Sequence, residues 1–469
     1  MPAMNQNNIK KNWNSVFSKA PATLEKMSKI NKVASAFNSC IDSVVKLSGE
    51  ELFKLIKKEK LSLKELEHIE HRSINSAADL IKGVFNCFKN GIAEEWTAED
   101  KSVFEWMLSN LGTKKMQTGG QAGIIANTLS LTGIKQIIVH SNALSELQAS
   151  QFYDRPNLVS FDKDGTVKQA STINRDKTSS IHWIVEFNKG DSLNLDGKEF
   201  ICPKSNRFIA TYDPPLFNFV IDKNFINYTN SNKIDYFVLS GYQALNAHNH
   251  GVKHVKDSVS VIAAWKKASP KSIVHLEIAS TQDKRVRRAV ALNLAPYADS
   301  VGVNERETMD ILEVIGQKKL LEECRKQPSS VNLFKAVRKI KDKLNCPRIQ
   351  LHMFVLYITV QNEDYPISPL ANRNGMVLAA TAAASKAYIG QLAAPTDILE
   401  ACGQPVSDIG LKELENLSFY LKQPDLLKKG ICNYKGCNVI AVPTIIIEKP
   451  KTLVGMGDTI SAFSLIGAR

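Results

Sequence analysis

The sequence lacks long apolar runs and several of the short motifs that identify common protein classes. No run of about eighteen apolar residues occurs in its 469 residues, so a membrane-spanning helix is not expected. There is no Gly-x4-Gly-Lys-Ser/Thr loop, which argues against a P-loop kinase. Internal repeats and low-complexity tracts are also missing. The remaining composition, with 43% hydrophobic and 23% charged residues, is typical of a globular protein.

The eight cysteines form no framework of pairs. The nearest two, Cys432 and Cys437, have no second pair that would complete a zinc site, so free buried thiols are expected. Residues 1–32 are polar and rich in lysine, without the apolar segment of a secretory signal. Together these features predict a cytoplasmic protein.

The net charge of +13 is distributed along the chain. The lysines are not clustered, and no RNA-binding signature or alternation of aromatic and basic residues occurs. We therefore expect a general attraction for anionic small-molecule substrates, and neither nucleic acid nor a membrane as a partner.

The second half of the chain alternates between short apolar strands and helical segments. Strands are predicted at 236–239, 272–278 and 300–303, each followed by a helical pattern. This alternation predicts an α/β fold with a mostly parallel sheet flanked by helices, in which ligands bind beyond the carboxyl ends of strands. Residues 49–111 are predicted to be helical, and residues 178–217 to form a small inserted antiparallel sheet.

The most informative segment is Gly455-Met456-Gly457-Asp458, between a predicted strand (438–447) and an apolar helical pattern. Its glycines allow a ligand to approach the backbone closely, and the unpaired N–H groups of a helix start suit a phosphate. A carboxylate at an anion site is suited to catalysis, in which Asp458 accepts a proton from a substrate hydroxyl. The alternative is that Asp458 only caps the helix.

Two carboxylates are predicted at the ends of neighbouring strands. His275 and Glu277 alternate along one strand, so they point to the same face. Asn304 and Glu307 follow the next strand at the start of a helix. Glu277 and Glu307 are candidates for ordering Mg²⁺ through water, and the alternative for Asn304 and Glu307 is a simple capping box.

Six segments occur in an order that matches one enzyme family. They are Asn38-x3-Asp42, Gly119-Gly120-Gln121-Ala122-Gly123, Ser240-Gly241-Tyr242-Gln243, His275-x-Glu277, Asn304-x2-Glu307 and Gly455-x-Gly457-Asp458. Across nearly its whole length the chain resembles the ADP-dependent sugar kinases, the archaeal-type ADP-dependent glucokinases and phosphofructokinases of the ribokinase-like superfamily. The resemblance implies a large ribokinase-like nucleotide-binding domain (1–42, 112–173 and 218–469) and a smaller α/β lid domain (43–111 and 174–217).

The resemblance also implies roles for the matching residues. ADP would be the phosphoryl donor, AMP the product, and Mg²⁺ the metal. Asp458 would be the catalytic base, and Gly455, Met456 and Gly457 would offer backbone N–H groups to the phosphoryl group. The implied Mg²⁺ shell consists of Glu277, Glu307, Asn304 and His275. The implied sugar-binding residues are Asn38, Asp42, Gly119, Gly120, Gln121 and Gln243.

The chain carries signals for two acceptor sugars. In the family a glutamate in the lid helix region favours glucose, and Glu95, in preference to its neighbour Glu94, would have that role here. A 6-phosphate needs cations, which Lys177, Arg207 and Arg175 would supply, Arg207 for either donor or acceptor. We therefore expect fructose 6-phosphate as the first acceptor with additional glucokinase activity, and the alternative is primarily a glucokinase.

The sequence disfavours two other functions. The Asn38–Asp42 and Gly119–Gly123 blocks argue against an ATP-dependent ribokinase-type kinase, and the intact Asp458 and Glu307 argue against a non-catalytic sugar sensor. A monomer is expected. The chain departs from the family pattern at Cys40, where a second amide side chain is common.

Overall fold

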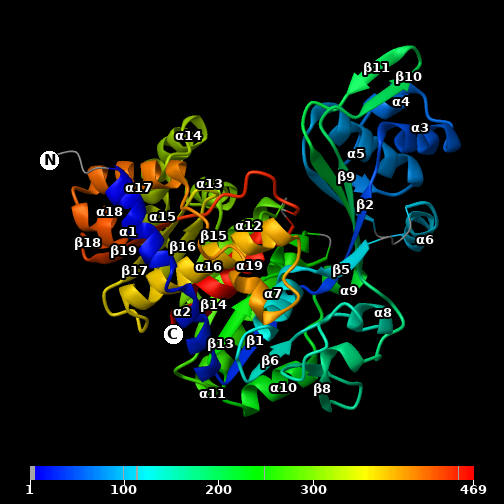
Figure 1. Ribbon diagram of the computed structural model, residues 1–469. Coiled ribbons are helices and arrows are strands. Elements are labelled where there is room, and N and C mark those ends of the chain that lie inside the picture. Colours follow the sequence, from blue (N-terminus) through cyan, green and yellow to red (C-terminus); the bar gives the residue numbers. More distant parts are fainter. Residues whose placement is uncertain (1–5, 99, 112–114, 248, 282, 453) are drawn as a thin grey trace.

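The computed structural model describes residues 6–98, 100–111, 115–247, 249–281, 283–452 and 454–469. Its strands form a large sheet of eleven strands, a sheet of six strands, and a two-stranded hairpin. Figure 1 shows a large body that contains most of the helices and a smaller lobe at the upper right that contains β9, β10 and β11. The α/β class with a large sheet and a smaller α/β unit is thus confirmed.

The large sheet is parallel in its centre and antiparallel at its edges. From β7 through β6, β1, β13, β14 and β15 to β16 all neighbours are parallel, whereas β8, β17, β19 and β18 are antiparallel additions. In sheet order the strands are β18 (Ile431–Tyr434), β19 (Cys437–Pro443), β17 (Leu356–Asn362), β16 (Arg348–His352), β15 (Ser300–Val303), β14 (Ile273–Glu277), β13 (Tyr236–Leu239), β1 (Lys32–Ala36), β6 (Gln136–Val139), β7 (Leu158–Phe161) and β8 (Val167–Gln169). The predicted strand–helix alternation of the second half is confirmed.

Helices flank this sheet and connect its parallel strands. The helices are α1 (Gln6–Phe17), α2 (Ala20–Lys26), α7 (Gln121–Ser130), α8 (Glu146–Ala149), α9 (Pro214–Phe217), α10 (Lys223–Ser231), α11 (Gly251–Ala268), α12 (Lys284–Ala289), α13 (Glu305–Val314), α14 (Lys318–Lys326), α15 (Ser330–Leu344), α16 (Pro369–Ile389), α17 (Asp408–Leu421), α18 (Pro424–Lys429) and α19 (Met456–Ser464). The C-terminal helix α19 packs along α16 and also against α7. These contacts place the start of α19 between elements that are far apart in the sequence. No helix of the described part is long and apolar enough to cross a membrane.

The smaller sheet is mixed, so the predicted antiparallel sheet is only partly correct. Its order is β3 (Ser73–Ile74), β4 (Glu94–Ala98), β12 (Asn206–Tyr212), β9 (Ile181–Phe187), β2 (Cys40–Lys46) and β5 (Lys115–Gly119). Strands β9 and β12 are antiparallel, but β4 pairs with β12 and β2 pairs with β9 in parallel. Helices α3 (Gly49–Lys58), α4 (Leu63–Glu67), α5 (Ala77–Asn90) and α6 (Lys101–Asn110) accompany it, and β10 (Ser192–Leu195) pairs with β11 (Lys198–Ile201).

Residues 49–111 were predicted to be helical, but strands β3 and β4 interrupt the helices of this segment. The apolar–polar alternation of Glu94–Ala98 is too short to stand out beside the helical segments on either side. The expected lid bounds (43–111 and 174–217) remain a prediction. In the structure the small sheet also includes Cys40–Lys46 and Lys115–Gly119.

The two faces of the small sheet differ in chemistry. One face packs into a separate apolar core that includes Ile41, Trp183, Phe208 and Ala210. Because side chains alternate along a strand, the neighbours of these residues lie on the opposite face. The strand register places the following residues there: Cys40, Asp42, Glu95, Gln117, His182, Arg207 and Thr211. One polar face thus collects chemistry-bearing side chains from five strands.

Candidate active site

The start of α19 carries a carboxylate whose ionisation is strongly perturbed. Gly455 precedes the helix in the left-handed region (φ +66°), and Asp458 is the third helical residue. No described residue makes a hydrogen bond to its carboxylate, so Asp458 does not act as the cap. Burial, with the charges of Glu277 and Asp42, raises the pKa of Asp458 to about 7, against the opposing effect of Lys386. A carboxyl that titrates near neutrality is suited to general base catalysis.

Lys386 of α16 is the cation of this site, and the sequence analysis missed it. Its Nζ donates to the backbone O of Gly455 at 3.2 Å and lies 3.5 Å from Thr459 Oγ1. Burial lowers the pKa of Lys386, while the charges of Asp458 and Asp42 oppose this effect. The available signal was a single charged residue inside the otherwise uncharged stretch Thr381–Ala387.

The predicted sugar-binding residues come together where β2 meets β5 and α7. Cys40 pairs with Gly119 and Asp42 with Gln117 across the two strands. A Cβ on Gly119 would overlap Asp42 Oδ1, and one on Gly120 (φ +71°) would lie 2.6 Å from Asn38 O. Only glycine therefore permits this close approach.

Within the described part of the chain, three amide oxygens of residues predicted to bind the sugar are buried without a hydrogen-bond partner. They belong to Asn38, Gln121 and Gln243, which the sequence analysis had assigned to substrate. Leaving a buried acceptor unpaired has a free-energy cost of about 1–3 kcal/mol, which a bound ligand with hydroxyl groups would remove. Gln121 is the first residue of α7, and Gln243 lies in the 3₁₀ turn Tyr242–Ala244 after β13.

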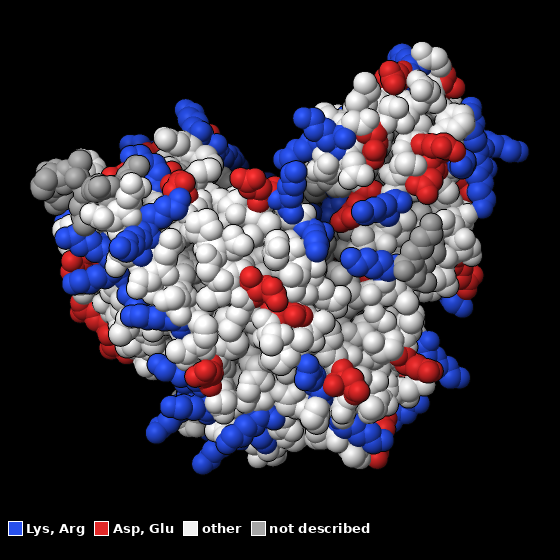
Figure 2. Space-filling view, viewed as in Figure 1, with Lys and Arg blue, Asp and Glu red and all other residues white. Residues whose placement is uncertain are grey.

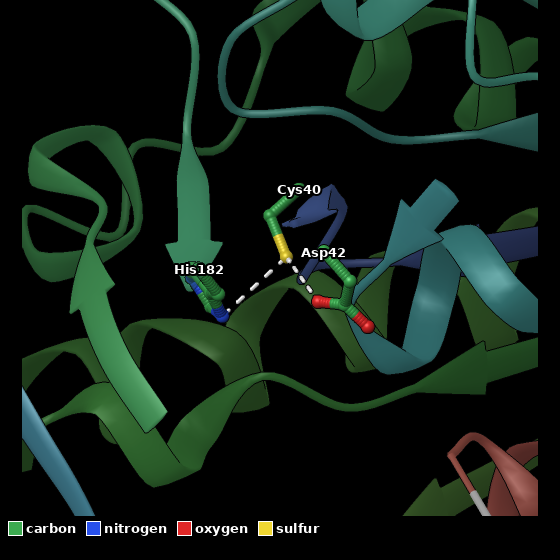
Figure 3. A group of neighbouring side chains, drawn as sticks. All are labelled: Cys40, Asp42 and His182. Atoms are coloured by element: carbon green, nitrogen blue, oxygen red, sulfur yellow. Dashed lines mark hydrogen bonds between the residues drawn. The ribbon is translucent and has the colours of Figure 1, made fainter. Parts of the chain in front are cut away.

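Asp42 lies in a small cluster with Cys40 and His182 (Figure 3). Burial raises the pKa of Asp42 to about 6, although the charges of His182 and Lys386 oppose this. His182, from β9, was not predicted. Its Nε2 lies 3.3 Å from Asp213 Oδ2, and Asp213 also accepts from Ser180 Oγ at 2.7 Å. A polar residue inside the apolar run Ile181–Phe187 was the available signal.

Glu95 lies on strand β4 and not in a helix, which corrects the expected setting of this residue. It is exposed on the polar face, where Thr211 Oγ1 donates to its Oε1 at 2.8 Å. Its charge contributes to the raised pKa of Asp42. Glu94 points elsewhere, because it pairs with Arg72 at 3.3 Å and accepts from Trp96 Nε1 at 2.8 Å. Glu95 is therefore the glutamate placed at the cluster.

The three cations proposed for a phosphate differ in their availability. Arg175 is held by Asp222 and Asp176 and by the carbonyl of Phe161, so its guanidinium has a structural role. Arg207 is half-buried on the same sheet face as Glu95, and Lys177 is exposed. Neither Arg207 nor Lys177 forms an ion pair with a described residue. Figure 2 shows lysine and arginine side chains along the hollow between the two lobes.

Two of the predicted metal residues, Glu277 and Glu307, line one cavity. Asp310 lines the same cavity. Glu277 is held between two imidazoles: His275 Nε2 lies 3.0 Å from its Oε2, and His352 Nε2 lies 3.3 Å from its Oε1. Burial and the charges of Glu277 and Asp310 hold the pKa of Glu307 well above its usual range. A cation between these carboxylates would relieve that repulsion, so the residues fit Mg²⁺.

Asn304 and Glu307 form the capping box that was the alternative prediction. The backbone N–H of Glu307 donates to Asn304 Oδ1 at 3.0 Å, and that of Asn304 donates to Glu307 Oε2 at 2.7 Å. The capping box is compatible with metal binding by Glu307, because it fixes this side chain at the cavity wall. His275 uses its other ring nitrogen on Ser300 Oγ at 2.9 Å, so it positions Glu277. His352, at the end of β16, was missed and lies next to Gly457.

Comparisons with known proteins place this geometry in context. A model of the ADP-specific Phosphofructokinase/Glucokinase conserved region matches residues 31–467. An ADP-specific phosphofructokinase of Methanosarcina acetivorans is 28% identical over 92% of this chain and 91% of the relative. An ADP-dependent glucose/glucosamine kinase of Pyrococcus furiosus is 30% identical over 97% of this chain and 98% of the relative.

Two solved structures resemble the whole chain. The last common ancestor of ADP-dependent phosphofructokinases from Methanosarcinales superposes with a TM-score of 0.83 and 29% identity, covering 99% of both chains. An ADP-dependent kinase in complex with fructose-6-phosphate and ADPbetaS gives a TM-score of 0.83 and 28% identity, with 99% and 98% of the two chains covered.

Proposed function

The chain belongs to the ADP-specific phosphofructokinase/glucokinase family, and from this premise we propose that it transfers a phosphoryl group from ADP to a hexose or hexose phosphate. AMP is the second product. The observation that carries the proposal is the carboxylate of Asp458 at the start of α19, with a pKa near 7 and no protein hydrogen bond in the described structure. The unpaired oxygens of Asn38, Gln121 and Gln243 support a hydroxyl-rich acceptor.

Asp458 is proposed as the general base. It accepts the proton of the acceptor hydroxyl as that oxygen forms a bond to the β-phosphorus of ADP. The bond between this phosphorus and the bridging oxygen breaks, and AMP leaves with the bonding electrons. The N–H groups of Met456 and Gly457 have no intrahelical partner, because they lie in the first turn of α19. They face charge that develops on the phosphoryl oxygens.

Lys386 favours the ionised form of Asp458 by lowering its pKa, and it adds positive charge beside the transferred group. When bound, Mg²⁺ would supply positive charge that neutralises the ADP phosphates. Glu277 and Glu307 would hold it, and His275 and His352 fix the orientation of Glu277. Domain closure over the sugar would exclude water from the phosphoryl group.

The acceptor is proposed to be fructose 6-phosphate first, with additional glucokinase activity. Arg207 lies four residues along β12 from Thr211, the partner of Glu95, which corresponds to roughly 13 Å. Asp42 and Glu95 suit hydroxyls, whereas Arg207, at the far end of the same face, suits a phosphate. Lys177 is exposed and precedes the other end of β9, so it would reach a phosphate only from the loop.

The test is product formation from ADP and from ATP, each with Mg²⁺, and with fructose 6-phosphate and glucose as acceptors. We expect AMP with ADP, a higher kcat/KM for fructose 6-phosphate, and little product with ATP. Activity only with ATP would refute the donor assignment, and a clear preference for glucose would make the glucokinase alternative correct.

A further inference from the structure

Three side chains at the sugar pocket have the chemistry of a metal site. Cys40 and Asp42 lie two residues apart on β2, and His182 faces them from β9. All three are buried, and one potential ligand atom of each lies within 4.8 Å of the other two. Figure 3 shows the sulfur of Cys40 between the imidazole of His182 and the carboxylate of Asp42.

The two distances from the sulfur of Cys40 are close to the edges of a zinc coordination tetrahedron. Cys40 Sγ lies 3.6 Å from His182 Nδ1 and 3.9 Å from Asp42 Oδ1. Zn–S bonds of about 2.3 Å and Zn–N or Zn–O bonds of about 2.1 Å, at tetrahedral angles, give edges of about 3.6 Å. Both distances from Cys40 Sγ are therefore within a few tenths of an ångström of a tetrahedral edge, and the ligand atoms of His182 and Asp42 lie within 4.8 Å of each other.

The outer contacts of His182 are those of a metal-binding histidine. Its Nε2 faces Asp213 Oδ2 at 3.3 Å, which leaves Nδ1 directed at Cys40. Asp213 is fixed by Ser180 Oγ at 2.7 Å and by the N–H of Leu216 at 3.1 Å. A carboxylate that accepts the second imidazole N–H is the usual support of a zinc-bound histidine, because it fixes the tautomer and the ring orientation.

We propose that Cys40, Asp42 and His182 bind one Zn²⁺ ion, and that this ion competes with the acceptor sugar. Three protein ligands leave a fourth position open. The competition rests on the proposed function, in which Asp42 binds the sugar. On binding, the thiol proton of Cys40 and any proton on Nδ1 pass to the solvent.

The ligand set separates this site from the Mg²⁺ cavity. Thiolate and imidazole favour zinc, whereas the oxygen ligands of Glu277 and Glu307 favour magnesium. Charges of both signs lie near the cluster. Glu95 and Asp213 add negative charge that attracts a cation, whereas the positive charge of Lys386, near Asp42, repels one. Because the ion would occupy Asp42, which the proposed function assigns to the sugar, zinc at this site acts as an inhibitor.

The first test is a titration of the full-length protein with Co²⁺, which replaces Zn²⁺ and reports its ligands by absorption. We expect one equivalent to give a sulfur-to-cobalt charge-transfer band and the strong visible bands of tetrahedral cobalt, both removed by one equivalent of Zn²⁺. Cys40→Ala should abolish the charge-transfer band. Cys402→Ala, which removes the one cysteine that is not buried, is the matched control and should retain it. No band in the wild type, or an unchanged band in Cys40→Ala, overturns the proposal.

A second variant tests the outer contact without removing a ligand. Asp213→Asn keeps the side-chain oxygen that accepts from Leu216 but loses the charge, and should weaken cobalt binding by about tenfold or more. Unchanged affinity would contradict the role of Asp213. These measurements need no ADP, so they stand whether or not the kinase proposal holds. If cobalt binds but neither fructose 6-phosphate nor glucose displaces it, the competition is refuted and the sugar lies elsewhere.

Discussion

The charge of Lys386 should control the pH at which the enzyme becomes active. In the ligand-free protein the pKa of Asp458 is raised to about 7 by burial and by Glu277 and Asp42, and Lys386 opposes this rise. A nearby opposite charge typically lowers a carboxyl pKa by about 1–3 units, so Lys386→Met should move the pKa of Asp458 to about 8 or higher. Asp458 can accept a proton only when it is ionised. Raising its pKa in Lys386→Met should therefore lower the activity at acidic and neutral pH and leave it unchanged at high pH.

The magnitude follows from the ionised fraction of Asp458. At pH 7 this fraction falls from about one half to about one tenth, so kcat/KM should fall about fivefold from ionisation alone. The assay is kcat/KM for AMP formation from pH 5.5 to 9.5, because its pH dependence reports the ionisation of the free enzyme, with Lys386→Arg as the control that keeps the charge. Lys386→Met should recover activity as the pH rises. A decrease in activity that is the same at all pH values would instead mean that Lys386 acts on the charge of the phosphoryl group. An acid limb that stays in place or moves to lower pH would refute the reasoning.

Four other predictions follow from single contacts. Glu95→Ala should lower kcat/KM for glucose by about tenfold or more and spare fructose 6-phosphate, because a hydroxyl partner is lost, and equal losses would make Glu95 structural. Arg207→Ala should raise KM for fructose 6-phosphate much more than for glucose if it binds the 6-phosphate, and Lys46→Ala on the same face is the control. Gly302→Ala would overlap Glu277 Oε2, so the Mg²⁺ concentration for half-maximal activity should rise, and an unchanged value would contradict the metal assignment. Asp458→Asn should melt at a higher temperature than the wild type at pH 8 and by a smaller margin at pH 5, because a raised folded pKa removes stability as the pH rises through about 7.

The parallel half of the large sheet could be predicted because its strands are short apolar runs separated by helices. Strands at 236–239 and 300–303 agree with the structure in both bounds, and 272–278 extends beyond β14 by one residue at each end. The small sheet was harder to predict. Strand β4 lies between helices in a segment of mixed pattern, and the parallel pairings of β2 with β9 and of β4 with β12 join residues far apart in the sequence.

The candidate site was predicted where residues form local patterns and missed where they do not. The turn at Gly455–Asp458 and the capping pair Asn304 and Glu307 are visible within a few residues. Lys386 and His182 belong to buried elements whose position beside Asp458 and Asp42 depends on tertiary packing. An ionisable residue in a mostly small or apolar stretch was their only signal, and such residues also occur in ordinary cores.

The most direct test of the central claim compares the wild type with Asp458→Asn. The measurement is AMP formed from ADP, Mg²⁺ and fructose 6-phosphate, together with the equilibrium affinity of each protein for the sugar. The account predicts AMP from the wild type, a fall of about 10²–10⁴-fold in turnover for Asp458→Asn, and a nearly unchanged sugar affinity. Turnover within a few-fold of the wild type, or an equal loss of binding and turnover, would contradict the role of Asp458 as the base.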